Sequence, residues 1–289
     1  MMTNETTEDN PPQWASTFWF AVYVTECIVI FTINAVTLLA FARNSHLRKR
    51  TTYLIINLTV ADLLVGVVSE PMDLYYHQID PGSIWQHFVI LILWNMFSVS
   101  SLINLSLIAL ERLHATLCPF RHCLIEKGFY FKTIFCSWLL TLLLSSVLSA
   151  PMLFESLGDA DRWVWVSHIV VTLLILTISY VIIIVNVKSN PPPQPIGSLA
   201  SDRKLSVTLF MVTVVSTLTI LPWVIYYVFP VDEWNRMSKT SQYHIENAVY
   251  VLYYTSSLVN PLIYAIRMKE FRKAVKDFIC QRGPESSRV

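Results

Sequence analysis

Polar side chains inside long apolar stretches are the residues of this sequence whose types suit chemistry. Asp62 stands in the middle of one such stretch, and neutral oxygen donors stand at similar depth in three others: Asn34, Ser101, Ser256, Ser257 and Asn260. One carboxylate surrounded by neutral oxygens is the ligand set that a small hard cation such as Na⁺ prefers. A hydrogen-bonded polar core that only holds helices together is the alternative, and the residue types fit both.

A charged pair, Glu111-Arg112, ends the third apolar stretch, and Asp202 opens the sixth. We expect Arg112 and Asp202 to bridge the two helices and close the mouth between them, so that breaking the bridge opens a crevice for a partner. Charges that face lipid headgroups are the alternative. The sequence offers no nucleophile–base pair and no transition-metal cluster at a suggestive spacing, so we expect no enzymatic activity and no required cofactor.

Two prolines interrupt apolar stretches. Pro222 lies in the sixth, and Pro261 lies in the seventh within Asn260-Pro261-Leu262-Ile263-Tyr264. A proline inside a helix frees a carbonyl and kinks the helix, which makes a hinge. Two hinges beside a buried carboxylate indicate a bundle built to move, as a transporter also is.

The elements that position these residues follow from composition. The chain has 289 residues, 54% hydrophobic and 14% charged, whereas soluble proteins average roughly 25% charged residues. This composition argues against a soluble enzyme or a nucleic-acid binder. Helices that span a bilayer need about 20 mostly apolar residues. Seven stretches meet that length, and they predict an all-α membrane protein, a seven-helix bundle: 18–42, 53–75, 84–110, 131–153, 163–187, 205–229 and 244–266.

The loops predict the orientation of the bundle. With the amino terminus outside, eighteen Lys and Arg residues lie on the cytoplasmic side and three outside, as the positive-inside rule requires. Asn4 is then an extracellular glycosylation acceptor. The five cysteines predict no disulfide, since none falls in an outer loop. Cys280 ends a short amphipathic stretch, 269–279, and is a candidate for palmitoylation.

The outer halves of the predicted helices carry acidic and aromatic side chains. An amphipathic cation or a basic peptide would suit a binding site lined by acidic and aromatic side chains. Solvated charges and interfacial anchoring are the alternatives for each residue. The candidate ligand contacts are Glu26, Asp73, Trp94, Asn95, His168, Tyr250 and Tyr254. At the other end, Ser287-Arg288-Val289 has the form that PDZ domains bind as an added strand.

Taken together, these residues resemble the rhodopsin-like (class A) G-protein-coupled receptors over about residues 17–280. The match comprises Asn34, Asn57, Ala61-Asp62, Glu111-Arg112, Trp138, Tyr180, Pro222, Asn260-Pro261-x-x-Tyr264 and Phe271-Arg272. The resemblance implies an extracellular tail (1–16), a seven-helix domain (17–267), and an amphipathic eighth helix with a cytoplasmic tail (268–289).

The resemblance also implies roles for the residues. Asp62, Ser101, Ser256, Ser257 and Asn260 correspond to the family's allosteric sodium site. Arg112 corresponds to the arginine that meets the G protein, and Tyr180 and Tyr264 to the pair that closes around a water in the active state. Asp202 takes the acidic position of the inner ionic lock. The implied function is a plasma-membrane receptor that passes a ligand signal to heterotrimeric G proteins by outward movement of the sixth helix.

Departures from the family pattern are as informative. His87 stands where the family has the cysteine of its extracellular disulfide, and Thr219-Ile220-Leu221-Pro222 replaces the Cys-Trp-x-Pro switch. Trp94 stands at the position of the carboxylate that amine receptors need. A solute transporter and a non-signalling, receptor-like scaffold remain alternative functions, although no internal three-helix repeat favours a transporter.

Overall fold

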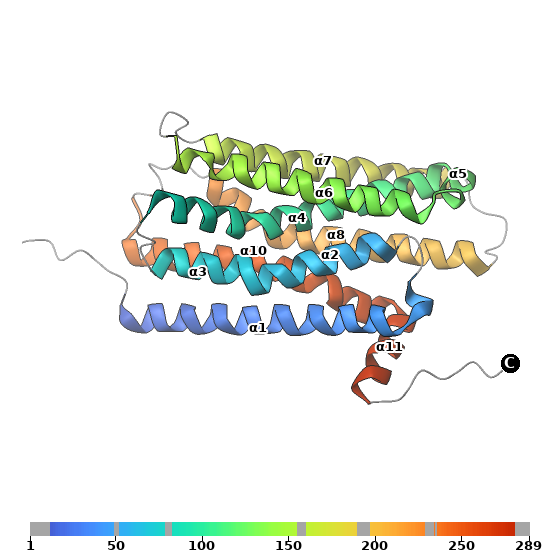
Figure 1. Ribbon diagram of the computed structural model, residues 1–289, viewed down its shortest axis with the longest axis horizontal. Coiled ribbons are helices and arrows are strands. Elements are labelled where there is room, and N and C mark those ends of the chain that lie inside the picture. The colour runs from blue at the N-terminus through green and yellow to red at the C-terminus, as the bar shows by residue number, and fades with distance from the viewer. Residues whose placement is uncertain are drawn as a thin grey trace, which may run out of the picture.

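Each of the seven apolar stretches forms a helix in the computed structural model, which describes residues 12–48, 52–78, 83–154, 160–189, 197–228, 234 and 236–280. All seven are long and apolar enough to cross a membrane, so the chain is a multi-pass membrane protein. Six of them are unbroken: α1 Gln13–Arg43, α4 Ile84–Leu117, α6 Lys127–Ser149, α7 Ala160–Ser189, α8 Gly197–Val228 and α10 Lys239–Arg267. They lie side by side along the long axis of the bundle (Figure 1).

The second span is interrupted, which the sequence did not predict. It consists of α2 Thr52–Leu64, a π-helical turn η2 Val65–Ser69, and α3 Glu70–Gln78. Gly66 lies in this turn because α1 passes very close: a Cβ built there would lie 2.7 Å from Ile30 Cγ2. A π-turn holds an extra residue, so it changes the direction in which the side chains beyond it point. Glu70 and Asp73 follow it directly.

Three short helices lie at the end of the bundle where α4 ends: η1 Ser45–Leu47, α5 Pro119–Cys123 and α11 Lys269–Ile279. Another short helix, η3 Ala150–Met152, lies at the opposite end. The helix α11 turns away from the direction of α10 (Figure 1). Phe271 of α11 is buried between Phe41 and Tyr264, with ring centroids 5.6 and 6.2 Å apart. The predicted amphipathic eighth helix is therefore present, with the predicted bounds.

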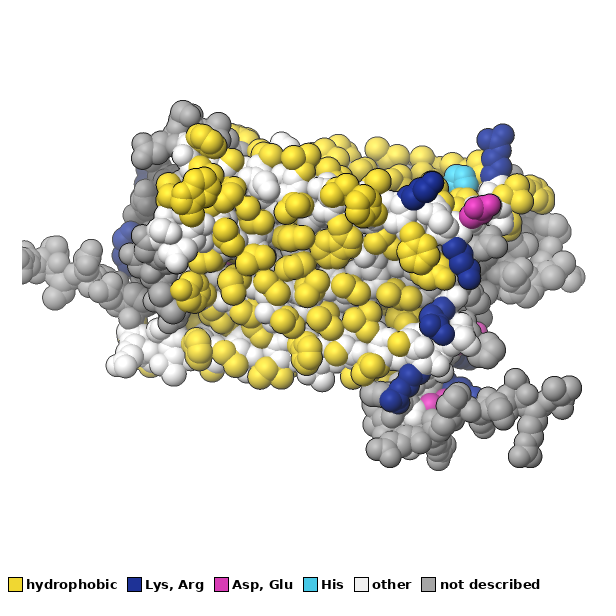
Figure 2. Space-filling view, viewed as in Figure 1, with side chains coloured by type: hydrophobic (Ala, Val, Ile, Leu, Met, Phe, Trp, Pro, Cys, Tyr) yellow, Lys and Arg dark blue, Asp and Glu magenta, His cyan; other side chains and the backbone are white. Residues whose placement is uncertain are grey.

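Apolar and basic side chains occupy different regions of the surface. Hydrophobic side chains cover the middle of the face shown in Figure 2, and Lys and Arg gather at the end that carries α5 and α11. The five cysteines are all free, as predicted. The interior holds one apolar cluster around Phe41, Tyr180 and Tyr264 and another around Tyr23, Trp165 and Trp223.

Candidate functional site

A carboxylate lies at the centre of the bundle, in the region between the two apolar clusters. Asp62 of α2 is fully buried. Ser101 Oγ of α4 donates to one of its oxygens, Oδ1, at 2.7 Å. Asn260 Nδ2 of α10 donates to the other, Oδ2. Three spanning helices therefore meet on one acidic side chain, as the sequence predicted for these residues.

A small cavity adjoins this cluster. Its volume is about 10 Å³, and Ser101, Ser256 and Ser257 are among its lining residues. A space of about 10–15 Å³ holds one water-sized particle. Asn34 of α1 reaches the same region, where its Nδ2 donates to the backbone oxygen of Ser257 at 3.2 Å. The donor set consists of oxygens with one carboxylate, which fits a sodium ion better than a transition metal.

A second polar group fixes the neighbouring helices. Asn57 Nδ2 of α2 donates to Asn104 Oδ1 of α4 at 2.7 Å. Trp138 Nε1 of α6 donates to Asn57 Oδ1 at 3.0 Å. Because buried amides need partners, these bonds set the rotation of α2, α4 and α6 relative to one another.

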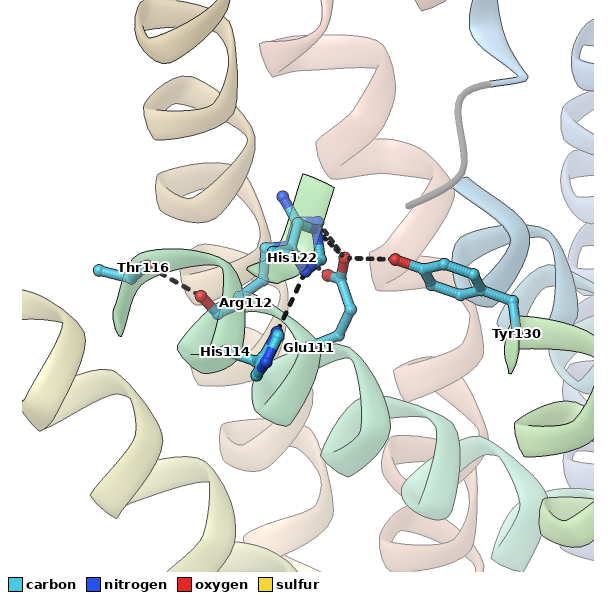
Figure 3. Close-up of polar contacts among 6 residues, drawn as sticks. All are labelled: Glu111, Arg112, His114, Thr116, His122 and Tyr130. Atoms are coloured by element: carbon cyan, nitrogen blue, oxygen red, sulfur yellow. Dashed lines mark hydrogen bonds and ion pairs between the residues drawn. The ribbon is translucent and has the colours of Figure 1, made fainter. Parts of the chain in front are cut away.

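At the end of α4, one carboxylate binds an arginine and two further side chains (Figure 3). Glu111 accepts bonds from Nε and a terminal nitrogen of Arg112, whose side chain is 2% exposed. His122 of α5 approaches Glu111 Oε1 to 3.2 Å through Nε2. Tyr130 of α6 donates its hydroxyl to the same oxygen at 3.3 Å. His114, also of α4, approaches the other ring nitrogen of His122, with 3.3 Å between the two Nδ1 atoms.

The structure thus pairs Arg112 with its neighbour Glu111, within α4. The predicted partner Asp202 belongs to α8, but its side chain lies outside the described part of the chain. The Arg112–Asp202 bridge therefore stays a prediction. His122 and Tyr130 were not expected at this site, because their sequence positions in a loop and at a helix start carry no signal of a contact with Glu111.

The remaining predicted switch residues are spread along α7, α8 and α10. Tyr180 of α7 is buried and its hydroxyl accepts a bond from Thr213 of α8 at 3.3 Å. The Tyr264 hydroxyl is buried and has no hydrogen-bond partner among the described residues. Pro222 and Pro261 lie inside α8 and α10, respectively.

The opposite half of the bundle encloses an aromatic cavity of about 100 Å³. Three of the predicted ligand contacts, Trp94, Asn95 and Tyr250, line it. Glu26 and Asp73 do not line it: Glu26 Oε1 accepts a bond from Thr255 at 2.8 Å, and Asp73 Oδ2 one from Tyr254 at 3.0 Å. Among its described lining residues the cavity has no charged side chain.

Three aromatic residues of this cavity were missed by sequence reasoning: Trp165, Trp223 and Tyr227. Trp223 is 4% exposed and stacks on Tyr227 with ring centroids 4.4 Å apart. Their spacing of four residues places them on one face of α8, and this spacing was the available signal. Trp223 lies one helical turn beyond Ile220, which stands at the position of the family's switch tryptophan.

Comparison with known proteins agrees with these motifs. The model of the family described as 7 transmembrane receptor (rhodopsin family) matches residues 33–160. The chain is 24% identical to the Substance-K receptor of Canis lupus familiaris, over 92% of this chain and 76% of the relative. It is 27% identical to the Histamine H2 receptor of Cavia porcellus, over 91% and 82%. By its motifs and by these matches, the chain is similar to the rhodopsin family of seven-transmembrane receptors.

A third relative is similar to this chain over a shorter segment. The Dopamine receptor 2 of Drosophila melanogaster is 34% identical over 97 residues, which are 31% of this chain and 17% of the relative.

The predicted modification sites and the predicted PDZ-binding residues stay predictions. Cys280, the palmitoylation candidate, is exposed at the end of α11. Asn4 and the carboxyl-terminal residues 287–289 lie outside the described residues.

Proposed function

We propose that this receptor transmits an extracellular ligand signal to a heterotrimeric G protein at the end of the bundle formed by α4, α5 and α8. The contact that carries this proposal is the clamp on Arg112, whose guanidinium is buried and held by Glu111. A buried arginine without competing partners would bind carbonyl or carboxylate oxygens of a docking helix. The clamp therefore corresponds to the resting state, in which Arg112 is withheld from the partner.

Activation is then a population shift between two packings of the bundle. In the signalling state α8 pivots at Pro222 and its inner half moves outward. The Tyr180–Thr213 bond between α7 and α8 breaks in that movement. Tyr180 and Tyr264 can then join through a water, because the Tyr264 hydroxyl lacks a partner among the described residues of the resting state.

Sodium would stabilise the resting packing. Asp62, Ser101, Ser256, Ser257 and Asn260 would hold the ion and supply it with one negative charge and neutral oxygens. These residues come from α2, α4 and α10, so an ion held among them favours the arrangement in which the three helices lie close.

The ligand would enter the aromatic cavity. The aromatic side chains of Trp94, Trp223 and Tyr250 line it, and aromatic rings attract cations. An amphipathic cation or a basic peptide fits this lining better than an anion. Three relatives are named as receptors for substance K, histamine or dopamine, so these compounds form the test panel. The peptide comes first, because Trp94 stands where amine receptors carry their carboxylate.

The same proposal places the amino terminus outside the plasma membrane and the carboxyl terminus in the cytoplasm. Membrane lipids contact the apolar surface, Cys280 carries a palmitoyl chain, and a PDZ domain binds residues 287–289. The family and relatives that match are receptors, so no observation favours the transporter. The scaffold alternative rests on the altered Thr219–Pro222 motif alone, and Trp223 restores a buried aromatic one turn away.

Cells that express the receptor, challenged with substance K, histamine and dopamine, test the proposal through G-protein activation. We expect at least one ligand or the basal state to activate a G protein, and Arg112→Ala to remove that signal at equal surface expression. Uptake of labelled solute without any G-protein activation would instead establish a transporter.

A further inference from the structure

A surface groove of about 580 Å³ lies between α4, α6 and α7, separate from the aromatic cavity. Ile103, Ser106 and Thr172 form its buried floor. Its rim consists of exposed apolar side chains, Leu110, Leu140, Trp163 and Val171. His168, expected from the sequence to contact the ligand, lines this groove instead.

The groove lies within the membrane band, because each of its lining residues belongs to one of three spanning helices. Its mouth is therefore continuous with the surface that lipids contact. Along α7 it reaches from Trp163 to Ile175, which is about 18 Å at a rise of 1.5 Å per residue. Half of a ~30 Å hydrocarbon core is about 15 Å. The groove is thus about as long as one leaflet is thick.

One polar atom in this groove lacks a partner. His168 Nε2 is buried, and no described residue forms a hydrogen bond with it. Leaving a buried ring nitrogen unpaired is costly, so a partner from outside the chain would stabilise it. His168 lies five residues from Trp163 and seven from Ile175, or about 7.5 and 10.5 Å along the helix, so it stands near the middle of the groove.

These features together specify an occupant. We propose that the groove binds a sterol, whose hydroxyl pairs with His168 and whose rigid ring system lies along α7 toward Leu110. A volume of about 580 Å³ lies within the range of ligand sites, roughly 300–1,000 Å³. A rigid ring system also loses less conformational entropy on binding than a flexible acyl chain does.

A fatty acid fits the groove less well. Its carboxylate would be buried without a counter-charge, because the described lining residues include no Lys or Arg. A phospholipid headgroup carries full charges and faces the same cost. A hydroxyl, in contrast, needs one partner, and His168 Nε2 supplies one.

Two neighbouring valines of α7 provide a matched pair of variants. Val171 lines the groove and is 54% exposed, whereas Val170 does not line it and is 45% exposed. Val171→Trp fills the groove without disturbing the core, and Val170→Trp adds the same side chain to the lipid-facing surface. His168→Leu removes the hydrogen bond, and His168→Gln retains an amide able to make one.

The experiment uses the full receptor in lipid nanodiscs that contain a photoreactive cholesterol analogue, with mass spectrometry to locate the label. We expect label on α4 and α7 in the wild type and in Val170→Trp, and its loss in Val171→Trp. His168→Leu should weaken labelling about three- to tenfold, the value of one hydrogen bond, and His168→Gln should recover most of it.

Equal labelling of Val171→Trp and Val170→Trp would overturn the proposal, as would groove labelling by photoreactive palmitic acid but not by the cholesterol analogue. A monodisperse profile on size-exclusion chromatography shows that each variant is folded. The readout needs no ligand and no G protein, so its result is independent of whether the receptor couples as proposed.

Discussion

At the scale of single residues, polar side chains in apolar stretches were predictable and their exact partners were not. Asp62, Ser101 and Asn260 were expected together, and they are hydrogen-bonded. Glu26 and Asp73 were placed in the same outer half, yet neither lines the aromatic cavity, and they bond to Thr255 and Tyr254. Helical periodicity predicts which face of a helix a residue lies on. It does not predict the exact direction of the side chain, which depends on how the helices pack.

Asp62→Asn tests the sodium assignment. The amide keeps a hydrogen-bonding side chain beside Ser101 but removes the negative charge, so the cation loses its main attraction. We expect basal G-protein activation of the wild type to fall when NaCl replaces N-methylglucamine chloride at equal ionic strength. In Asp62→Asn the two salts should give the same activity; a sodium response that survives the substitution would refute the ion site.

His122→Ala tests the clamp on Arg112. His122 approaches Glu111 at 3.2 Å, so its removal should loosen Glu111 and raise basal nucleotide exchange about two- to fivefold, as the loss of one hydrogen bond would. The control is a double-mutant cycle: in a Glu111→Gln background His122→Ala should add little. Additive effects of the two substitutions would show that His122 acts elsewhere.

At the scale of elements, the seven helices and the eighth amphipathic helix were predictable because bilayer thickness sets helix length. The π-turn Val65–Ser69, in which Gly66 packs closely against α1, was not predictable. Likewise the clamp at α5 depends on how a five-residue helix folds back on α4. Such features follow from contacts between helices and leave little trace in hydropathy.

Gly66→Ala probes this close approach. The new Cβ would lie 2.7 Å from Ile30 Cγ2 and 3.1 Å from the Cys27 carbonyl oxygen. Because Ile30 is fully buried, the helices must shift, at a cost of roughly 1–3 kcal/mol. Thermal unfolding of the purified receptor should occur a few degrees lower. Gly128→Ala, whose Cβ meets nothing within 4 Å, should leave the melting temperature unchanged or slightly raised.

At the scale of the whole molecule, the distribution of charge predicts the topology. Basic residues gather at the end with α5 and α11 (Figure 2), and the positive-inside rule places that end in the cytoplasm. An epitope tag before residue 1 should therefore be stained in intact cells, and a tag after residue 289 only after permeabilisation. N-glycosidase should shorten the wild type but not Asn4→Gln. The reverse staining pattern would invert the assignment.

The central claim is that Glu111 holds Arg112 away from a G protein that Arg112 binds when released. Adjacent substitutions should then have opposite effects on nucleotide exchange by purified receptor and heterotrimer in lipid vesicles. Glu111→Gln weakens the clamp and should raise basal exchange above wild type, whereas Arg112→Ala should reduce exchange to that of receptor-free vesicles. Exchange that is unchanged by Arg112→Ala, or that falls with Glu111→Gln, would contradict the account.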